Sequence, residues 1–263
     1  MEVIHLSPWD LSIATLLVMA LALLTSRVGM GLSKGLLVAA ARTVIQLLLI
    51  GLVLTTLFEH AALHWVALMA LIMLLVAGRE VMARQARRFR GWWGYGIGTL
   101  AMFTSAFTAT ILALTVIISP APWWEPQYAI PLLGMLLGNT MTGIALGLDR
   151  LTTTAWQQRR MIEGRLILGQ TWSESIQDIR RDAARSGLMP IINAMAAAGI
   201  VSLPGMMTGQ ILAGTPPMEA VKYQILVMFL ITAGTGFGTL GAIWLGARRL
   251  FDERERLRLD RLA

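Results

Sequence analysis

The sequence predicts an all-α, polytopic transmembrane helix bundle of about seven spans. Hydrophobic residues make up 56% of the 263 residues and charged residues only 14%, whereas a soluble domain carries about 25% charged residues. Apolar segments long enough to cross a bilayer recur along the whole chain, and Lys and Arg concentrate in alternate connections between them. The chain has no cysteine, which excludes disulfides, thiolate metal sites and cysteine nucleophiles.

The spans follow from segment length, because a hydrocarbon core about 30 Å thick needs about 20 apolar residues in each helix. Seven segments meet this requirement, and they are Trp9–Val28, Leu36–Leu57, Leu63–Val81, Ile97–Ile118, Tyr128–Leu148, Met189–Ala213 and Val221–Ala247. The sixth contains Pro204-Gly205, so we expect it to be kinked or broken. No stretch fits a soluble domain, so residues 1–263 are expected to form a single transmembrane domain.

The basic residues predict the orientation in the membrane. Four connections contain no Lys or Arg, and they are Met1–Pro8, Phe58–Ala62, Ser119–Gln127 and Gly214–Ala220. The other connections and the C-terminal tail carry nearly all of these residues. Because cytosolic loops are enriched in Lys and Arg, we expect the N-terminus outside and the C-terminus in the cytosol. The net charge of +7 then marks the cytosolic face and not a nucleic-acid site.

Small residues recur every four positions in three spans, and such faces allow helix backbones to approach closely. The three sets are Ala101, Ser105, Ala109 and Ala113; Gly134, Gly138 and Thr142; and Gly234, Gly238, Ala242 and Gly246. The pattern fits packing within the chain and also a homodimer seam.

Polar side chains inside apolar spans are costly and usually face a cavity or a partner helix. Those that predict a polar path through the bundle are Arg42, Gln46, Asn139, Thr140, Asn193, Thr208, Gln210, Lys222 and Gln224. Hydrogen bonding between helices explains any one of them equally well. No span holds Asp or Glu near its middle, which argues against transport driven by protons or sodium.

The segment Gly199–Pro217 (GIVSLPGMMTGQILAGTPP) combines a predicted helix break with two adjacent thioethers. Pro204 removes a helix hydrogen bond, and Gly205 adds backbone freedom. Met206 and Met207 follow with soft, flexible side chains. The segment predicts either a gate that faces a transported substrate or a kinked packing helix.

The longest polar stretch, Asp149–Gly187, predicts a cytosolic loop with a short amphipathic helix. Thr171 and Glu174 have the spacing of a capping box, which predicts a helix start at Thr171. One apolar face follows at helical spacing, with Trp172, Ile176 and Ile179. This face is expected to lie against the protein's own spans or in a groove of a partner.

The sequence argues against two enzymatic activities, ATP hydrolysis by this chain and serine hydrolysis. Neither Lys34 nor Lys222 follows a glycine, so the chain has no phosphate-binding loop and any ATP must be bound by another chain. The segment Gly31–Gly35 matches the G-x-S-x-G pattern of serine hydrolases. All three histidines fall at the opposite face of the predicted bundle, which argues against an intramembrane hydrolase.

Four stretches resemble the Fet-type iron-export permeases, the membrane subunits of a bacterial ABC transporter with plant relatives linked to aluminium tolerance. They are RTVIQLLLIGLVL from Arg42, IPLLGMLLGNTM from Ile130, VSLPGMMTGQILAG from Val201 and AVKYQILVMF from Ala220. The resemblance covers essentially the whole chain. It implies a multi-pass protein of the bacterial inner membrane that exports cytosolic iron, which would support iron homeostasis and resistance to oxidative stress. It also implies a separate ATP-binding subunit that holds ATP and magnesium, in an assembly of two permeases with two ATPases.

The stretch EGRLILG, from Glu163 to Gly169, resembles the start of the coupling motif of ABC permeases, with Gly164 and Arg165 in place of its two alanines. The resemblance implies that this part of the loop contacts the ATPase. Without cysteine or a midspan carboxylate or histidine, iron would have to use Met, Asn, Gln or backbone oxygens, which are weak or unusual Fe²⁺ ligands. The metal-binding residues are therefore unassigned. Alternatives are an ABC permease for another metal or small solute, and an ATP-independent channel or carrier.

Overall fold

The computed structural model of the protein describes residues 7–59 and 62–263, and this part of the chain contains helices and no strand. The long helices are α1 (Pro8–Arg27), α2 (Ser33–Glu59), α3 (Leu63–Ala83), α6 (Pro126–Gln157), α9 (Gln177–Ala197) and α11 (Pro217–Arg249). One further span is built without interruption from α4 (Trp92–Met102), the π-helical η1 (Phe103–Phe107), α5 (Thr108–Leu112) and the π-helical η2 (Ala113–Ile117). The short elements are α7 (Arg159–Ile167), α8 (Trp172–Ser175), α10 (Gly205–Leu212) and the 3-10 turn η3 (Leu259–Arg261). Residues 1–6 of the predicted outer segment Met1–Pro8 lie outside the described residues.

Six helical segments of the described chain are long and apolar enough to cross a membrane. They coincide with six of the seven predicted spans, so the all-α polytopic fold is confirmed. The largest difference in length is at α6, which continues beyond the predicted end at Leu148 to Gln157. This extension carries the helix out of the apolar segment and into the polar stretch that the sequence predicted to be a loop.

The predicted sixth span, Met189–Ala213, is broken, as expected from the sequence, and it is not among the six helices of spanning length. The helix α9 ends at Ala197 and α10 begins only at Gly205. Gly199 takes up a left-handed backbone conformation, with φ of +86°, which favours glycine and ends the helix there. The break therefore starts before Pro204, which lies directly ahead of α10 and accepts a hydrogen bond from the Thr208 amide at 3.1 Å.

By its internal contacts the chain divides into two compact units. The first contains α1 and α2, which pack on each other as a helical hairpin. Gly29 and Gly31 have φ of +74° and +70° in the connecting turn, a conformation that other residues rarely adopt. Most side chains of both helices are exposed within this unit.

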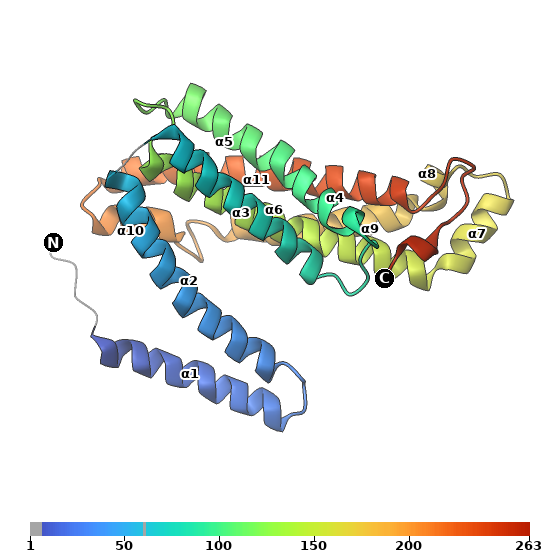
Figure 1. The fold of residues 1–263 in the computed structure, drawn as a ribbon, viewed down its shortest axis with the longest axis horizontal. Helices are drawn as coiled ribbons and strands as arrows, with labels where there is room; N and C mark the ends of the chain where they lie inside the picture. The colour runs from blue at the N-terminus through green and yellow to red at the C-terminus, as the bar shows by residue number, and fades with distance from the viewer. Residues whose placement is uncertain (1–6, 60–61) are drawn as a thin grey trace. The chain divides into compact units, whose positions relative to one another are not determined.

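The second unit is a bundle in which α6 is the central helix (Figure 1). A Cβ added at Gly147 would touch Ile243, and one added at Gly234 would touch Leu136, so α6 and α11 run in the same direction. Arg150 lies 3.8 Å from Asp182, and Gly143 touches Gly187, so α9 runs antiparallel to α6. We call the end at which α3, α6 and α11 terminate the basic end of this unit, because it carries most of the arginines.

The small-residue faces of α11 and of the α4–η2 span lie inside this unit. A Cβ at Gly238 would come within 2.6 Å of Ser105 Oγ and 2.7 Å of Thr140 Cγ2. Ala113 and Ala242 are fully buried. These two faces therefore serve packing within the chain. On α6, by contrast, nothing lies within 4 Å of a Cβ built at Gly138, which is exposed.

The C-terminal tail folds back on the basic end. The Ala263 amide donates to the Arg88 carbonyl at 2.8 Å, and the Arg90 amide donates to the Arg261 carbonyl at 2.8 Å. Phe251 and Leu262 are buried beneath these bonds. The basic tail that follows the last span is therefore an ordered part of the bundle.

Candidate functional site

The polar stretch between Asp149 and Gly187 is helical over most of its length. It comprises the extension of α6, all of α7 and α8, and the first half of α9. In Figure 1, α7 and α8 lie together at one end of the bundle. A side chain on α7 ties these pieces together, because Arg165 donates to the Ser175 carbonyl at 3.1 Å and pairs with Asp178 at 2.9 Å. The pieces therefore form a structured projection at the basic end.

The predicted helix start at Thr171 is confirmed. The Thr171 amide and hydroxyl both donate to Glu174 Oε2 at 2.8 Å, and the Glu174 amide donates back to Thr171 Oγ1 at 3.4 Å. These donors hold the pKa of the Glu174 carboxyl below its usual value, because they stabilise the ionised form. The helix that begins here, α8, is a single turn that ends at Ile176, where φ is −118°, and α9 then runs from Gln177 to Ala197.

The apolar face of this helix lies against the protein's own chain. Ile176 and Ile179 are 0% and 2% exposed. Of the two predicted positions for this face, it therefore takes the one against the protein's own helices and not the one in a partner's groove. Trp172 is half-buried, with its ring centroid 6.0 Å from that of Phe251. Of the residues predicted to couple to an ATPase, Ile176 and Ile179 are therefore placed to hold the helix in position rather than to meet a partner directly.

The exposed part of the projection is the turn between α7 and α8. Gly169 has φ of +88°, and its amide donates to the Leu166 carbonyl at 3.0 Å, so the glycine closes α7 with a left-handed residue. Ile167 and Leu168, just before it, are 85% and 83% exposed. Glu163 lies on α7 and is also exposed. An adjacent exposed aliphatic pair on a braced turn is a typical anchor for a protein partner.

Sequence reasoning missed Ile167 and Leu168, although the signal was present. They are the aliphatic pair between Arg165 and Gly169, in the most polar part of the chain. Arg165, which departs from the alanine of the coupling motif, acts here as the residue that braces α7 on α8 and α9. We call Ile167–Thr171 the coupling turn.

A cavity of about 510 Å³ lies at the other end of the second unit, where α9 ends and α11 begins. Its lining residues are Met195, Ala198, Gly199, Leu203, Pro204, Met207, Val221, Gln224, Ile225, Met228 and Phe229. Three thioethers, from Met195, Met207 and Met228, are its most polarizable groups. We call this cavity the methionine pocket.

Gln224 supplies the pocket with an amide group. The residue is 8% exposed, and its Oε1 has no hydrogen-bond partner among the described residues. The Thr232 hydroxyl lies 2.6 Å from Met195 Sδ and 2.7 Å from the Met228 carbonyl, which positions two of the methionines. A buried amide oxygen without a partner is available to a ligand, because a buried acceptor that makes no hydrogen bond costs about 1–3 kcal/mol.

The residues predicted to form a polar path fall in different places. Arg42 and Gln46 lie on α2, in the first unit. The other predicted residues lie on α6, α9, α10, α11 or the loop before α10, and of these Pro204, Met207 and Gln224 line the methionine pocket. Those that do not line it are Asn139, Thr140, Asn193, Gly205, Met206, Thr208, Gln210 and Lys222. The structure thus brings Pro204, Met207 and Gln224 into one cavity and adds Met195 and Met228 to them.

Over residues 7–59 and 62–263, no three side chains of His, Cys, Asp or Glu come close enough together to hold a metal ion. The donors that the pocket offers are thioether sulfurs and an amide oxygen. Thioethers favour soft ions, whereas an amide oxygen is a hard but weak ligand.

Apolar helices of spanning length around a packed core define a polytopic membrane protein. Residues 8–251 match the model of a family described as "Uncharacterised protein family (UPF0014)", and the chain belongs to this family. The chain is 39% identical to the UPF0014 membrane protein slr1647 of Synechocystis sp., over 87% of this chain and 88% of the relative. It is 29% identical to the Probable iron export permease protein FetB of Escherichia coli, over 96% and 95% of the two chains. It is 31% identical to Protein ALUMINUM SENSITIVE 3 of Arabidopsis thaliana, over 88% and 83%.

These relatives confirm the resemblance to Fet-type permeases that the sequence motifs predicted. No solved structure matches the chain.

Proposed function

We propose that this protein is the membrane-spanning permease subunit of an ATP-driven exporter, with iron as its cargo. A relative covered over 95% of its length is named an iron export permease, and the chain has no phosphate-binding loop of its own. ATP and magnesium would then be held by a separate ATP-binding subunit. By resemblance, two permeases and two ATPases form the complex in the bacterial inner membrane, with the basic end in the cytosol.

The observation that carries the proposal is the coupling turn. An ATPase can move a permease only through a surface that is exposed, mechanically connected to the spans and unlike the surrounding polar face. Ile167 and Leu168 are exposed, and Arg165 ties the turn to α9. Because α9 packs along α6 and α11, a push on this turn would be transmitted directly to the bundle.

The methionine pocket is the proposed cargo contact. It lies beside the break between α9 and α10, where Gly199 has a left-handed backbone conformation and the helix is interrupted. Weak thioether and amide ligands would hold a metal ion only transiently, which suits a site from which the ion must leave. The same donors favour a softer cargo such as Cu⁺ over Fe²⁺, so an exporter of another metal is the second candidate.

Co-purification of the ATPase tests the proposal. Leu168→Ser should release the ATPase subunit, because it removes an apolar anchor from the docking surface. The matched control is Ile200→Ser, since Ile200 is 91% exposed at the other end of the second unit. Equal retention of the ATPase by both variants would place the docking surface elsewhere.

A further inference from the structure

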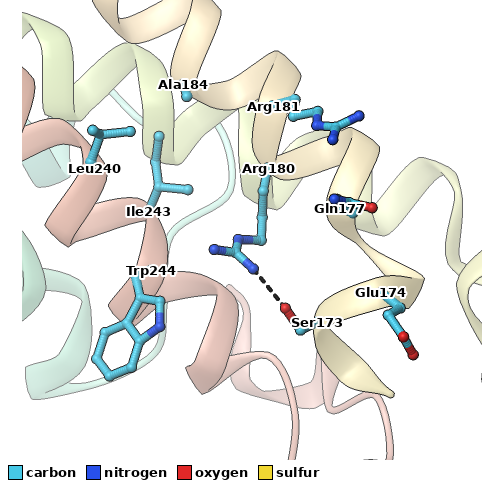
Figure 2. A pocket seen from close by; sticks show the side chains of 9 residues that line it. All are labelled: Ser173, Glu174, Gln177, Arg180, Arg181, Ala184, Leu240, Ile243 and Trp244. Atoms are coloured by element: carbon cyan, nitrogen blue, oxygen red, sulfur yellow. Dashed lines mark hydrogen bonds between the residues drawn. The ribbon is translucent and has the colours of Figure 1, made fainter. Parts of the chain in front are cut away.

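A second cavity, of about 530 Å³, lies at the basic end between α8, α9 and α11. One wall is apolar and comes from α11, with Leu240, Ile243 and Trp244. The facing wall is polar, and Figure 2 shows Arg180 reaching from α9 toward Ser173 of α8. The cavity therefore joins a cationic wall to an apolar one at the boundary of the last span.

The cationic wall lacks a counterion. The Arg180 guanidinium donates to Ser173 Oγ at 2.9 Å and lies 5.8 Å from the centre of the Trp172 ring. Arg248 lies 5.5 Å from the same ring. Within residues 7–59 and 62–263, no carboxylate oxygen is within 4.0 Å of either guanidinium. Arg180, which lines the cavity, thus has no carboxylate partner, and an anion bound in the cavity would neutralise its charge.

Two acidic side chains lie near Arg180 or Trp172, and both already accept hydrogen bonds; one of them, Glu174, also lines the cavity. The Glu174 carboxylate accepts both hydrogen bonds from Thr171, and in Figure 2 it lies on the far side of Ser173 from Trp244. The Glu255 carboxylate accepts the Trp172 backbone amide at 3.1 Å. Arg181, also at the rim of the cavity, adds a further positive charge.

An apolar stripe leads from this cavity along α11. Phe237, Leu240 and Trp244 are 75%, 49% and 52% exposed, and their spacing places them on one helix face with Arg248 at its basic end. A ligand that matched the whole feature would carry an anionic group for the arginines and a long apolar tail for the stripe.

We propose that this cavity binds the phosphate of an anionic phospholipid at Arg180, with an acyl chain along Phe237, Leu240 and Trp244 and with Arg248 at the basic end of that apolar stripe. Arginine binds phosphate oxygens through charge-assisted hydrogen bonds, and basic pockets between spans on the cytosolic side suit such headgroups. Trp244 lies where indole rings meet the headgroup level. A soluble phosphate would satisfy the arginines but leave the apolar stripe uncovered.

The test is native mass spectrometry of the purified full-length permease, titrated with phosphatidylglycerol and separately with phosphatidylcholine. Arg180→Gln and Arg248→Gln should each weaken phosphatidylglycerol binding about fivefold and leave phosphatidylcholine binding unchanged. Arg254→Gln removes the same charge from an exposed position of the tail and should behave as the unmodified protein. Equal binding of the two lipids, or equal losses in all three variants, would overturn the proposal.

Two further measurements keep the test decisive. Raising the ionic strength should weaken phosphatidylglycerol binding to the unmodified protein, because the contact is electrostatic, and a salt-independent affinity would refute it without any variant. Inorganic phosphate should compete only weakly. Full displacement of the lipid by inorganic phosphate would identify a soluble anion as the ligand and overturn the lipid assignment. Because the readout is lipid retention and not transport, failure here would leave the proposed export function untouched.

Discussion

The coupling turn depends on the backbone of Gly169, and replacing it with valine tests that dependence. Gly169 has φ of +88°, and nothing lies within 4 Å of a Cβ built there. Valine therefore meets no steric clash, and the whole effect comes from the left-handed conformation, which costs a β-branched residue about 1–3 kcal/mol. The native turn is then populated less, and affinity for a partner that requires it falls by the same factor, about 5- to 150-fold.

The chain supplies a matched control for this substitution. Gly164 lies five residues earlier on α7, is also free of neighbours within 4 Å of a built Cβ, and has no positive φ. Gly164→Val should therefore leave the turn intact. The assay is co-purification of the ATPase with each variant from detergent-solubilised membranes, with permease insertion checked in the same membranes. Equal ATPase retention by Gly169→Val and Gly164→Val would refute the role of the left-handed turn.

Three other predictions use the same unit. Gly187→Ala should lower the Tm of the purified protein by several degrees, because its Cβ would lie 2.6 Å from the Gly143 carbonyl oxygen and α6 and α9 would have to separate. Gly138→Ala should leave the Tm unchanged, because the space around Gly138 is open. Equal Tm values for the two variants would contradict this packing. Glu174→Ala should lower the Tm at pH 7, because the Glu174 carboxyl has a lowered pKa and its ionised form stabilises the folded chain above the usual carboxyl pKa. The difference should shrink as the pH falls from that usual pKa through the lowered pKa, and a difference that persists in full at low pH would exclude the ionised cap. Replacing Met207 and Met228 together with leucine should weaken the stimulation of the complex's ATPase activity by the metal that it transports, while preserving apolar volume. Unchanged stimulation would show that the pocket does not contact the metal.

The sequence predicted most of the fold because hydrophobic length and charge placement are local signals. Six spans coincide with helices, and the cap at Thr171 was visible in its spacing to Glu174. The break in the sixth span was predicted at Pro204 and lies earlier, because the sequence pattern did not identify Gly199 as the residue that ends the helix. The polar first half of α9 was also predicted to belong to the cytosolic loop and its apolar second half to a span, whereas both halves belong to one helix.

The candidate site was less accessible because it depends on which faces the fold buries. Ile176 and Ile179 look like a docking face in the sequence, yet the bundle buries them. Ile167 and Leu168 are visible in the sequence as an aliphatic pair in a polar stretch, but they have no helical periodicity, and only the structure shows that both are exposed. Pro204 was expected to break the helix, yet α9 has already ended at Ala197. Within that segment, Gly199 and not Pro204 is the residue that ends α9.

The most direct test of the central claim is ATP-dependent iron accumulation in inside-out vesicles that contain this permease and its ATP-binding subunit. The account predicts uptake that requires ATP, is lost in Leu168→Ser and is retained in Ile200→Ser. Uptake that proceeds without ATP or without the ATPase subunit would contradict it and would identify the chain as an independent channel or carrier.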